Sequence, residues 1–561
     1  MLSAVALAAA TFTAASPMAD AVAESTTSVT GSDGVTYTAT NHLVREGRGR
    51  GREWLLTWAG SADPTKPDFM AVIDATRESR SYGKVVNTVT MGPGLGNEAH
   101  HMQYVWHKGD RIYAGGLFSD TVFVLDARAL PELKLVGVAA PGDTPCGTAP
   151  DAFQVLRDGT AYGTFLGSGP VPGPCTYTNG EVRVGNGATG SPGEIVRFDE
   201  NGKVLAEIPA ATAEGEDPEQ CANEPALEKA TCANPHGIMV NEERNIMVAS
   251  DFLEGRHWGS PDVALREDLT RQTVRVWDIE NRNNPKLLSV SKVHDGPRAQ
   301  LENDPIWAES RVIMEPALPH KRHHKGAFVS SMTGGSVFYT PDITAKKPRW
   351  REVFDDTTAY RKAGADDLTG GGDNGSWLMV SPDDRFLFHT VMGYPKAYGK
   401  PLDKTRGMLY VLDIRKLLAA GDDPRCEVDR LSEVYSGGIE RDCPAVVGVQ
   451  MIRDTTDGGT HWGAMDNFRR DPRGFYRETE HIRRIATANY FIAGAFGGDG
   501  NHKVCMHDLS RWGGVRLDSR FRDENTGRPC VEFNRRSWPH GDFGDARPHG
   551  VLFAVSDRVL R

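Results

Sequence analysis

No segment of this 561-residue chain has the run of about 20 apolar residues that a membrane-spanning helix requires. One apolar stretch, Leu2 to Ala15, is too short to span a bilayer but has the length of a signal-peptide core. Small-x-small cleavage motifs follow it and end at Ala21 and Ala23, although no basic segment precedes it. Residues 1–23 are therefore predicted to be a signal peptide. We expect a periplasmic or secreted protein without membrane insertion.

Several catalytic motifs are also absent. The chain has no HExxH, GxSxG or CxxC, so nothing indicates a zincin-type protease, a serine-hydrolase elbow or a zinc–thiolate site. Basic charge is scarce too, because 64 Lys and Arg stand against 75 Asp and Glu, which gives a net charge of −11. We therefore expect no nucleic-acid partner, and we interpret the short basic run His320 to Lys325 as a solvated turn.

The eight cysteines fall as close neighbours along the chain. An even number in local pairs, flanked by Gly and Pro, is typical of disulfides formed in an oxidising compartment. The neighbours give four predicted disulfides, while other pairings stay open at this point: Cys146 with Cys175, Cys221 with Cys232, Cys426 with Cys443, and Cys505 with Cys530.

A repeated unit runs along the chain. The 61 glycines and 33 prolines favour many short strands joined by turns. Each unit has a first strand, a turn with charged residues, a strand ending in small residues and a strand ending in Asp. The units begin at His101, Asp151, His236, Ala327, Trp377 and Trp462. Their strand-type alternation and length are typical of the blades of a β-propeller.

The two ends of the chain complement one another. Trp54 to Gly60 and Phe69 to Asp74 resemble the second and third strands of a blade, whereas Pro548 to Val555 resembles a lone first strand. Pairing them closes the ring without a free strand edge. The predicted fold is all-β: one seven-bladed β-propeller over 24–561, whose first blade is closed by the strand near 549–555. The Cys/Gly/Pro-rich stretches 168–234 and 509–545 are expected as loops on one face, and a two-domain chain is the alternative.

Histidines stand where the inner strands of a propeller begin, and these positions converge on the axis. Four blades supply them: His101, His236, His461 and His549. His236 and His549 share the sequence Pro-His-Gly. Because adjacent strand residues point to opposite faces, His101 is favoured over His100. Several imidazoles in one channel predict a site for copper, iron(II) or zinc.

The remaining blades offer Asp151, Glu315 and Asn374 at similar positions. Asp151 and Glu315 are the candidate catalytic residues, either as further ligands or as partners of the second nitrogen of a ligating histidine. His389 is interpreted as structural. Six other histidines are interpreted as loop or surface residues: His107, His257, His294, His481, His502 and His507.

Short stretches across most of the chain resemble the selenium-binding protein family, which includes the bacterial methanethiol oxidases. The most specific is Glu98-Ala99-His100-His101 with the following Phe118 to Asp126, and weaker matches lie at Met70 to Asp74, Arg244 to Ser250 and Ser381 to Leu387. The resemblance implies a seven-bladed propeller and a copper-dependent oxidation of a small thiol to an aldehyde, sulfide and peroxide. The family's cysteine-bearing stretch after the His pair is absent, since Met102 to His107 stands there.

These observations give one leading function and two alternatives. The leading one is a copper- or iron-dependent oxidoreductase that uses O2 on a small organic substrate. The alternatives are a four-histidine iron oxygenase that cleaves an aromatic alkene, by analogy of geometry alone, and a non-catalytic metal-binding propeller. The oligomeric state is not predicted. The candidate substrate-binding residues are Trp106, Trp462, Tyr394 and Met465.

Overall fold

The computed structural model describes fifteen stretches of the chain and carries the strands of a closed ring. These stretches are 22–44, 52–94, 96, 98–167, 175–183, 193–210, 233–253, 270–300, 312–332, 334–365, 374–393, 406–437, 440–452, 459–492 and 500–561. The predicted signal peptide lies outside them up to residue 21. Among the helices of these stretches, none is long and apolar enough to cross a membrane.

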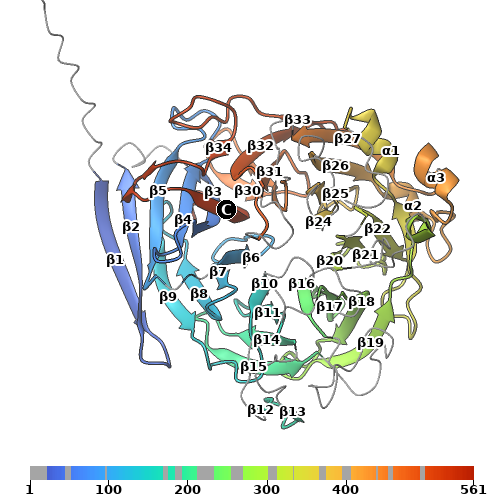
Figure 1. Cartoon of the computed structure of the whole chain (residues 1–561), viewed down its shortest axis with the longest axis horizontal. Coiled ribbons are helices and arrows are strands. Elements are labelled where there is room, and N and C mark those ends of the chain that lie inside the picture. The colour runs from blue at the N-terminus through green and yellow to red at the C-terminus, as the bar shows by residue number, and fades with distance from the viewer. Residues whose placement is uncertain are drawn as a thin grey trace, which may run out of the picture.

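Seven antiparallel sheets of four to six strands surround a central axis in the described chain (Figure 1). Short turns join successive strands, as alternating strand sequences bounded by Gly and Asp predict. From the inside outward, blades 2 to 4 are β6 (Ala99–Met102), β7 (Arg111–Gly116), β8 (Thr121–Asp126) and β9 (Lys134–Ala139); β10 (Pro150–Val155), β11 (Ala161–Phe165), β14 (Glu194–Phe198) and β15 (Val204–Pro209); and β16 (Pro235–Asn241), β17 (Ile246–Asp251), β18 (Thr273–Asp278) and β19 (Lys286–Lys292).

Blades 5 to 7 continue the same pattern. Their strands are β20 (Ile313–Ala317), β21 (Ala327–Ser331), β22 (Val337–Thr340) and β23 (Arg351–Phe354); β24 (Gly375–Val380), β25 (Phe386–Val391), β26 (Gly407–Asp413) and β27 (Ala445–Ile452); and β28 (Trp462–Asp466), β31 (Arg484–Ala488), β32 (Lys503–Leu509), β33 (Val515–Leu517) and β34 (Val531–Glu532). Neighbouring inner strands contact one another in a closed circle. The predicted all-β, seven-bladed propeller is therefore confirmed.

Blade 1 joins the two ends of the chain, as predicted. The C-terminal strand β37 (Ala546–Val555) pairs with β3 (Glu53–Ser61), which continues into β4 (Phe69–Asp74) and β5 (Val85–Gly92). The sequence did not predict two further strands, β1 (Val22–Thr30) and β2 (Thr36–Val44), which extend this sheet beyond β5. The Asn41 side chain bonds the backbone of Leu133, so the added hairpin ties blade 1 to blade 2.

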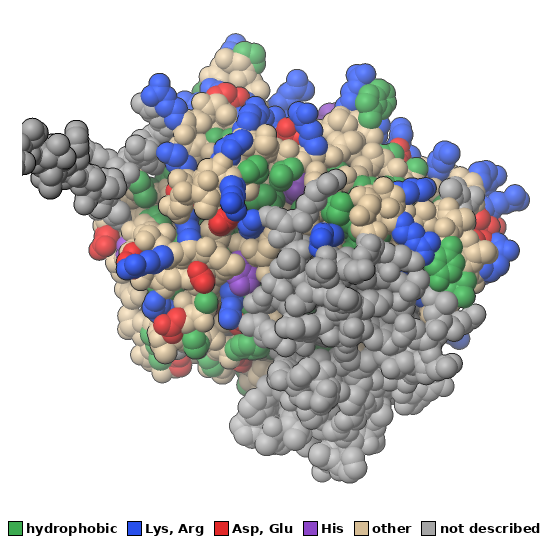
Figure 2. Space-filling view, turned by 45° about the horizontal axis from the view of Figure 1, so that its top comes forward, with side chains coloured by type: hydrophobic (Ala, Val, Ile, Leu, Met, Phe, Trp, Pro, Cys, Tyr) green, Lys and Arg blue, Asp and Glu red, His purple; other side chains and the backbone are tan. Residues whose placement is uncertain are grey.

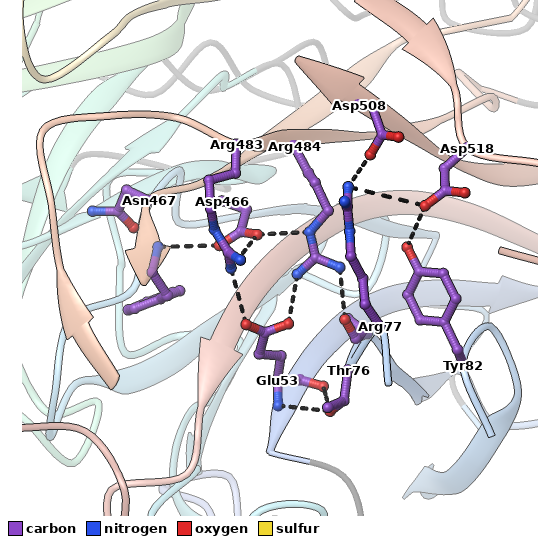
Figure 3. A network of polar contacts seen from close by, with 12 residues as sticks. Glu53, Thr76, Arg77, Tyr82, Asp466, Asn467, Arg483, Arg484, Asp508 and Asp518 are labelled. Atoms are coloured by element: carbon purple, nitrogen blue, oxygen red, sulfur yellow. Dashed lines mark hydrogen bonds and ion pairs between the residues drawn. The ribbon is translucent and has the colours of Figure 1, made fainter. Parts of the chain in front are cut away.

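A buried charge network joins blade 7 to blade 1 (Figure 3). The Arg484 guanidinium, which is fully buried, donates to Asp466 at 2.7 Å, to Glu53 at 2.8 Å and to the backbone oxygen of Ala75 at 2.7 Å. Arg483 reaches the same two carboxylates at 2.9 and 3.0 Å. The strands from the two ends of the chain pair in blade 1, next to this network. These contacts therefore stabilise the closed ring.

The described chain also contains short helices and hairpins that are not part of the seven blade sheets. They are three short helices, α1 (Thr357–Lys362), α2 (Arg415–Ala419) and α3 (Leu431–Ser436), one 3-10 turn (Pro297–Gln300), and three hairpins, β12 (Cys175–Thr176) with β13 (Val182–Arg183), β29 (Phe468–Arg470) with β30 (Tyr476–Glu478), and β35 (Ser537–Trp538) with β36 (Gly541–Asp542). On the face in Figure 2, Lys and Arg side chains are scattered over the described surface with Asp and Glu between them. Neither predicted loop stretch is wholly loop, because 168–234 contains β14 and β15 and 509–545 contains β33, β34 and the hairpin of β35 and β36.

Two predicted disulfides are present, Cys426–Cys443 and Cys505–Cys530. Cys146 is also disulfide-bonded, while the side chains of Cys175, Cys221 and Cys232 lie outside the described part.

One histidine interpretation is wrong. His507 is not a loop or surface residue, because it lies fully buried on β32 and its Nε2 is 3.1 Å from the Thr487 hydroxyl. His257 lies outside the described residues.

Candidate metal centre

A β-bulge in the inner strand aims side chains at the axis. In five blades, two inner-strand residues stand opposite one residue of the second strand, and in blade 1 the unpaired residue is His549. Such bulges bend a strand and redirect its side chains. The bulged pairs are His100–His101, Asp151–Ala152, His236–Gly237, Met314–Glu315 and Ser376–Trp377. In blade 7, His461 immediately precedes β28.

The bulge in β6 changes the expectation for the His pair. Strand alternation predicted that only one of His100 and His101 faces the axis, but the two rings stack with centroids 4.4 Å apart. The His100 ring also lies 4.0 Å from that of His549. Both imidazoles therefore belong to the axial cluster, and both are fully buried.

Two groups of potential ligand atoms share His101. In each group, the atoms lie within 4.8 Å of one another. The first is His100, His101, Asp151 and His236, and the second is His101, His461 and His549. The four predicted histidines are thus brought close together, but no single group contains all four: His236 belongs to the group with Asp151, and His461 and His549 belong to the other.

The second nitrogen of several rings already has a neighbour. His461 Nδ1 lies 2.6 Å from the Ser376 hydroxyl, which in turn donates to the His461 backbone oxygen at 2.7 Å. The hydroxyl has a single proton, so Nδ1 is the donor in the first bond and Nε2 keeps its lone pair. His236 Nδ1 lies 3.0 Å from the backbone oxygen of Met314 and 3.2 Å from Glu315 Oε1. Fixing one nitrogen in this way is how proteins orient a metal-ligating histidine.

The nitrogen and oxygen atoms of the cluster are suited to bind a cation. His101 Nε2 and His461 Nε2 face each other at 3.0 Å, and Asp151 Oδ1 lies 2.7 Å from His101 Nδ1. Several buried atoms nevertheless have no aligned hydrogen bond: both carboxylate oxygens of Asp151, both nitrogens of His549, His101 Nδ1, His100 Nδ1 and His236 Nε2. Buried polar atoms are rarely left without partners, and imidazole nitrogens with one carboxylate are the donors that copper, iron and zinc accept.

Burial keeps most of these imidazoles neutral. It lowers the pKa of His101 to about 3, lowers that of His100, and holds those of His461 and His549 well below the ordinary value. Neutral imidazole is the form that binds a metal, so these rings need not lose a proton at neutral pH.

The part of the cluster around Asp151 carries charge. Burial alone would raise the pKa of Asp151, but the imidazoles of His236 and His101 outweigh it and hold the pKa well below its usual value. The pKa of His236 is raised, because Asp151 and Glu315 outweigh its burial. Burial raises the pKa of Glu315. Negative charge thus concentrates on Asp151, beside His101.

The candidate substrate residues do not all lie here. The Trp462 ring lies 4.1 Å from that of His101, between centroids. Trp106 instead packs on Phe468 and donates to the backbone oxygen of Asp110, and Met465 lines a cavity at one end of the axis. Tyr394 lies outside the described residues. Asn374 precedes β24 but is in neither ligand group.

Sequence reasoning missed two residues of the site. Ser376 is the residue that blade 6 brings to the cluster, and its position in the bulge matches that of Asp151 and His236. Tyr104 follows β6 and crosses the axis: its hydroxyl donates to Glu315 at 2.5 Å, accepts from the Ile238 backbone at 3.2 Å, and its ring lies 4.9 Å from Trp462. No sequence signal marks either residue, since the bulge that places Ser376 is defined only by the pairing of β24 with β25.

Comparison with known proteins gives distant relatives. No family model matches the chain. A methanethiol oxidase from a Hyphomicrobium species is 23% identical over 293 residues, which cover 50% of this chain and 58% of that protein. The match therefore spans less than two thirds of the relative.

A solved structure shares the architecture. A hypothetical selenium-binding protein from Sulfolobus tokodaii superposes with a TM-score of 0.56 at 14% identity, covering 90% of this chain and 94% of that one. A periplasmic gluconolactonase from Pseudomonas aeruginosa has a TM-score of 0.44 at 11% identity, covering 90% and 99%. Sequence and fold together support the resemblance stated above: the chain is similar to the selenium-binding protein family, as a distant relative of it.

Proposed function

We propose that this protein is a metal-dependent oxidase that uses O2 on a small organic thiol, with copper as the metal. The observation that carries the proposal is the group His101, His461 and His549, three fully buried imidazoles whose ligand atoms lie within 4.8 Å of one another. Three protein ligands leave the coordination position that catalytic metal sites keep open. His236, across His101, is the fourth candidate ligand. The likeness to a methanethiol oxidase supports the substrate class.

The overall reaction balances in atoms and in electrons. One thiol, one O2 and one water give one aldehyde, one hydrogen sulfide and one hydrogen peroxide; the carbon is oxidised and O2 takes up the two electrons. A bound copper ion supplies the one-electron steps that O2 needs to react with a closed-shell thiol.

The protein's own residues orient the ligands and handle the protons. Asp151 is ionised, lies 2.7 Å from His101 and 3.1 Å from His100, and is the candidate base for the thiol proton. Glu315 accepts a hydrogen bond from Tyr104 and lies close to His236, so it can hold a proton beside His236. Full burial of the cluster excludes bulk water and keeps peroxide chemistry away from solvent.

Iron(II) is the second candidate metal. The group His100, His101, Asp151 and His236 combines imidazoles with one carboxylate, a donor set that iron(II) oxygenases use. Cleavage of an aromatic alkene is the corresponding alternative reaction. A metal-binding propeller without catalysis is the third possibility, and the test below separates the three.

The test combines metal analysis with oxygen uptake. We expect purified protein to contain near-stoichiometric copper with a copper(II) resonance spectrum, and to consume O2 with methanethiol while sulfide and formaldehyde accumulate. His461→Ala should lose the metal and keep the fold. His389→Ala is the matched control, because His389 is equally buried on β25 but bonds Gly335 instead of the cluster.

Three outcomes would contradict the proposal. Protein without near-stoichiometric metal refutes the site. Iron together with uptake on phenylpropenoids favours the alkene oxygenase. Metal without uptake on either substrate class favours the non-catalytic propeller.

We also propose a periplasmic or secreted location, which two disulfides of the described chain support. N-terminal sequencing of the mature protein tests it, since an intact Met1 would refute removal of a signal peptide.

A further inference from the structure

The buried cluster has two ends along the propeller axis, and their chemistry differs. At one end, residues that follow the second strands form a buried apolar group. Its buried side chains include Leu117, Leu166, Phe252, Met332, Met392 and Phe491. Phe252 packs on His236 and Phe491 on His461, each with ring centroids 4.7 Å apart. Apolar side chains therefore pack directly on the imidazoles at this end.

The other end opens into a cavity of about 720 Å³. Carboxylates outnumber cationic side chains in its lining: Asp110, Glu242, Glu243, Glu478 and Glu480 stand against Lys108 and Arg157. His107 and His320 also line it. A concave surface with excess negative charge raises the local concentration of cations. A metal ion therefore approaches the axis more favourably from this side.

Three methionines from inner strands lie in the wall of the cavity. Met239, Met379 and Met465 all line it, and their exposed fractions are 8%, 2% and 8%. They come from three inner strands, β16, β24 and β28, at equivalent places. Each stands three residues after a residue of the axial cluster or its wall, namely His236, Ser376 and Trp462. Along each of these inner strands, a residue of the axial cluster or its wall is thus followed by a methionine that lines the cavity.

Tyr104 lies at the level between the cavity and the imidazoles. Its partner Ile238 lies between His236 and Met239 on β16, and its partner Trp462 lies between His461 and Met465 at β28. Tyr104 therefore contacts both strands between the axial histidines and the methionines.

We propose that Met239, Met379 and Met465 form a loading site that first holds Cu(I) and passes it to the axial histidines. Thioether sulfur is a soft ligand that selects Cu(I) over hard cations. Leucine fills nearly the same volume as methionine in a core, so packing alone does not demand sulfur at three equivalent positions. The inference rests on the proposed copper centre, to which it adds the route of the metal and a second set of ligands.

The test measures how fast metal-free protein takes Cu(I) from a coloured chelator under anaerobic, reducing conditions. Replacing the three by leucine (Met239→Leu, Met379→Leu, Met465→Leu) should slow uptake severalfold, because leucine has no soft ligand atom for Cu(I). The final copper content should stay that of the wild type. The matched control is Met332→Leu with Met392→Leu at the apolar end, which should load at the wild-type rate.

A second variant detects the site directly. His461→Ala weakens the axial centre but leaves the methionines, so Cu(I) added to it should show sulfur ligands by X-ray absorption. The single leucine variants replace the triple variant if that one does not fold.

The outcomes separate the two proposals. Wild-type uptake rates in every leucine variant would overturn the loading site while leaving the copper centre intact. A final copper content reduced by the leucine substitutions would also overturn it, because the methionines would then hold a resident ion. No Cu(I) bound by the wild type under any condition would refute the copper centre itself.

Discussion

Ser376→Ala removes the hydroxyl that fixes the tautomer of His461. In the structure, this hydroxyl accepts from Nδ1 at 2.6 Å and donates to the His461 backbone oxygen at 2.7 Å, and both residues are fully buried. Without it, a buried N–H loses its partner, which costs about 1–3 kcal/mol. The proton is then no longer confined to Nδ1, so Nε2 is available to a metal for less of the time. Loss of such a partner typically weakens metal binding by about 10- to 100-fold.

Chelator competition measures the metal dissociation constant, and urea unfolding of the metal-free protein measures stability. We expect S376A to lose metal affinity by that factor, whereas Ser376→Thr, which keeps a hydroxyl, recovers part of it. Ser381→Ala is the control: Ser381 is also buried and bonds Asp383 at the other end of β24, away from the cluster. It should lose stability but not affinity. If S376A is destabilised while its affinity stays that of the wild type, the tautomer argument is wrong.

Two further predictions concern stability. Arg484→Met leaves Glu53 and Asp466 paired only with the partly exposed Arg483 and should lower the free energy of unfolding by about 3 kcal/mol in urea, the lower end of the cost of breaking a buried pair; an unchanged midpoint would show that this network between blades 7 and 1 does not stabilise the ring. His507 is the second case, because burial lowers its pKa to about 3, below the value near 6.5 in the unfolded chain. Its neutral form therefore favours the fold above pH 6.5, and this contribution falls by up to about 1.4 kcal/mol per pH unit as the pH drops from 6.5 toward 3. The difference between wild type and His507→Leu across pH 7 to 5 should show that slope, and parallel pH profiles would refute it.

Much of the ring could be predicted because its signals are local. Pro-His-Gly recurs around His236 and His549, and the end strand complements the strand that begins near Trp54. Alternation within each strand and a turn after it are enough to count blades. The hairpin of β1 and β2 escaped prediction because its residues are mostly Thr, Ser and other polar types, whose burial on one face comes only from packing beside blade 2.

The details of the site depend on pairing between distant strands. A bulge exists only relative to the neighbouring strand, so the alternation argument for His100 and His101 could not reveal it. Ser376 and Tyr104 are ordinary residue types whose partners lie 85 and 211 residues away. His507 was misassigned for a related reason: both faces of a blade are covered by neighbouring blades, so a polar residue on its third strand can be buried.

The unequal blades have a physical explanation in the cluster. Blades 1, 2, 4 and 7 bring imidazoles, and the other three bring side chains that contact them. Asp151 of blade 3 lies against His101, Glu315 of blade 5 against His236, and Ser376 of blade 6 bonds His461. A ligating imidazole is oriented by a partner for its second nitrogen, and the blades without an axial histidine place such side chains beside His101, His236 and His461. The three blades without an axial histidine are therefore part of the metal centre we propose, and their substitution would change its affinity rather than its position.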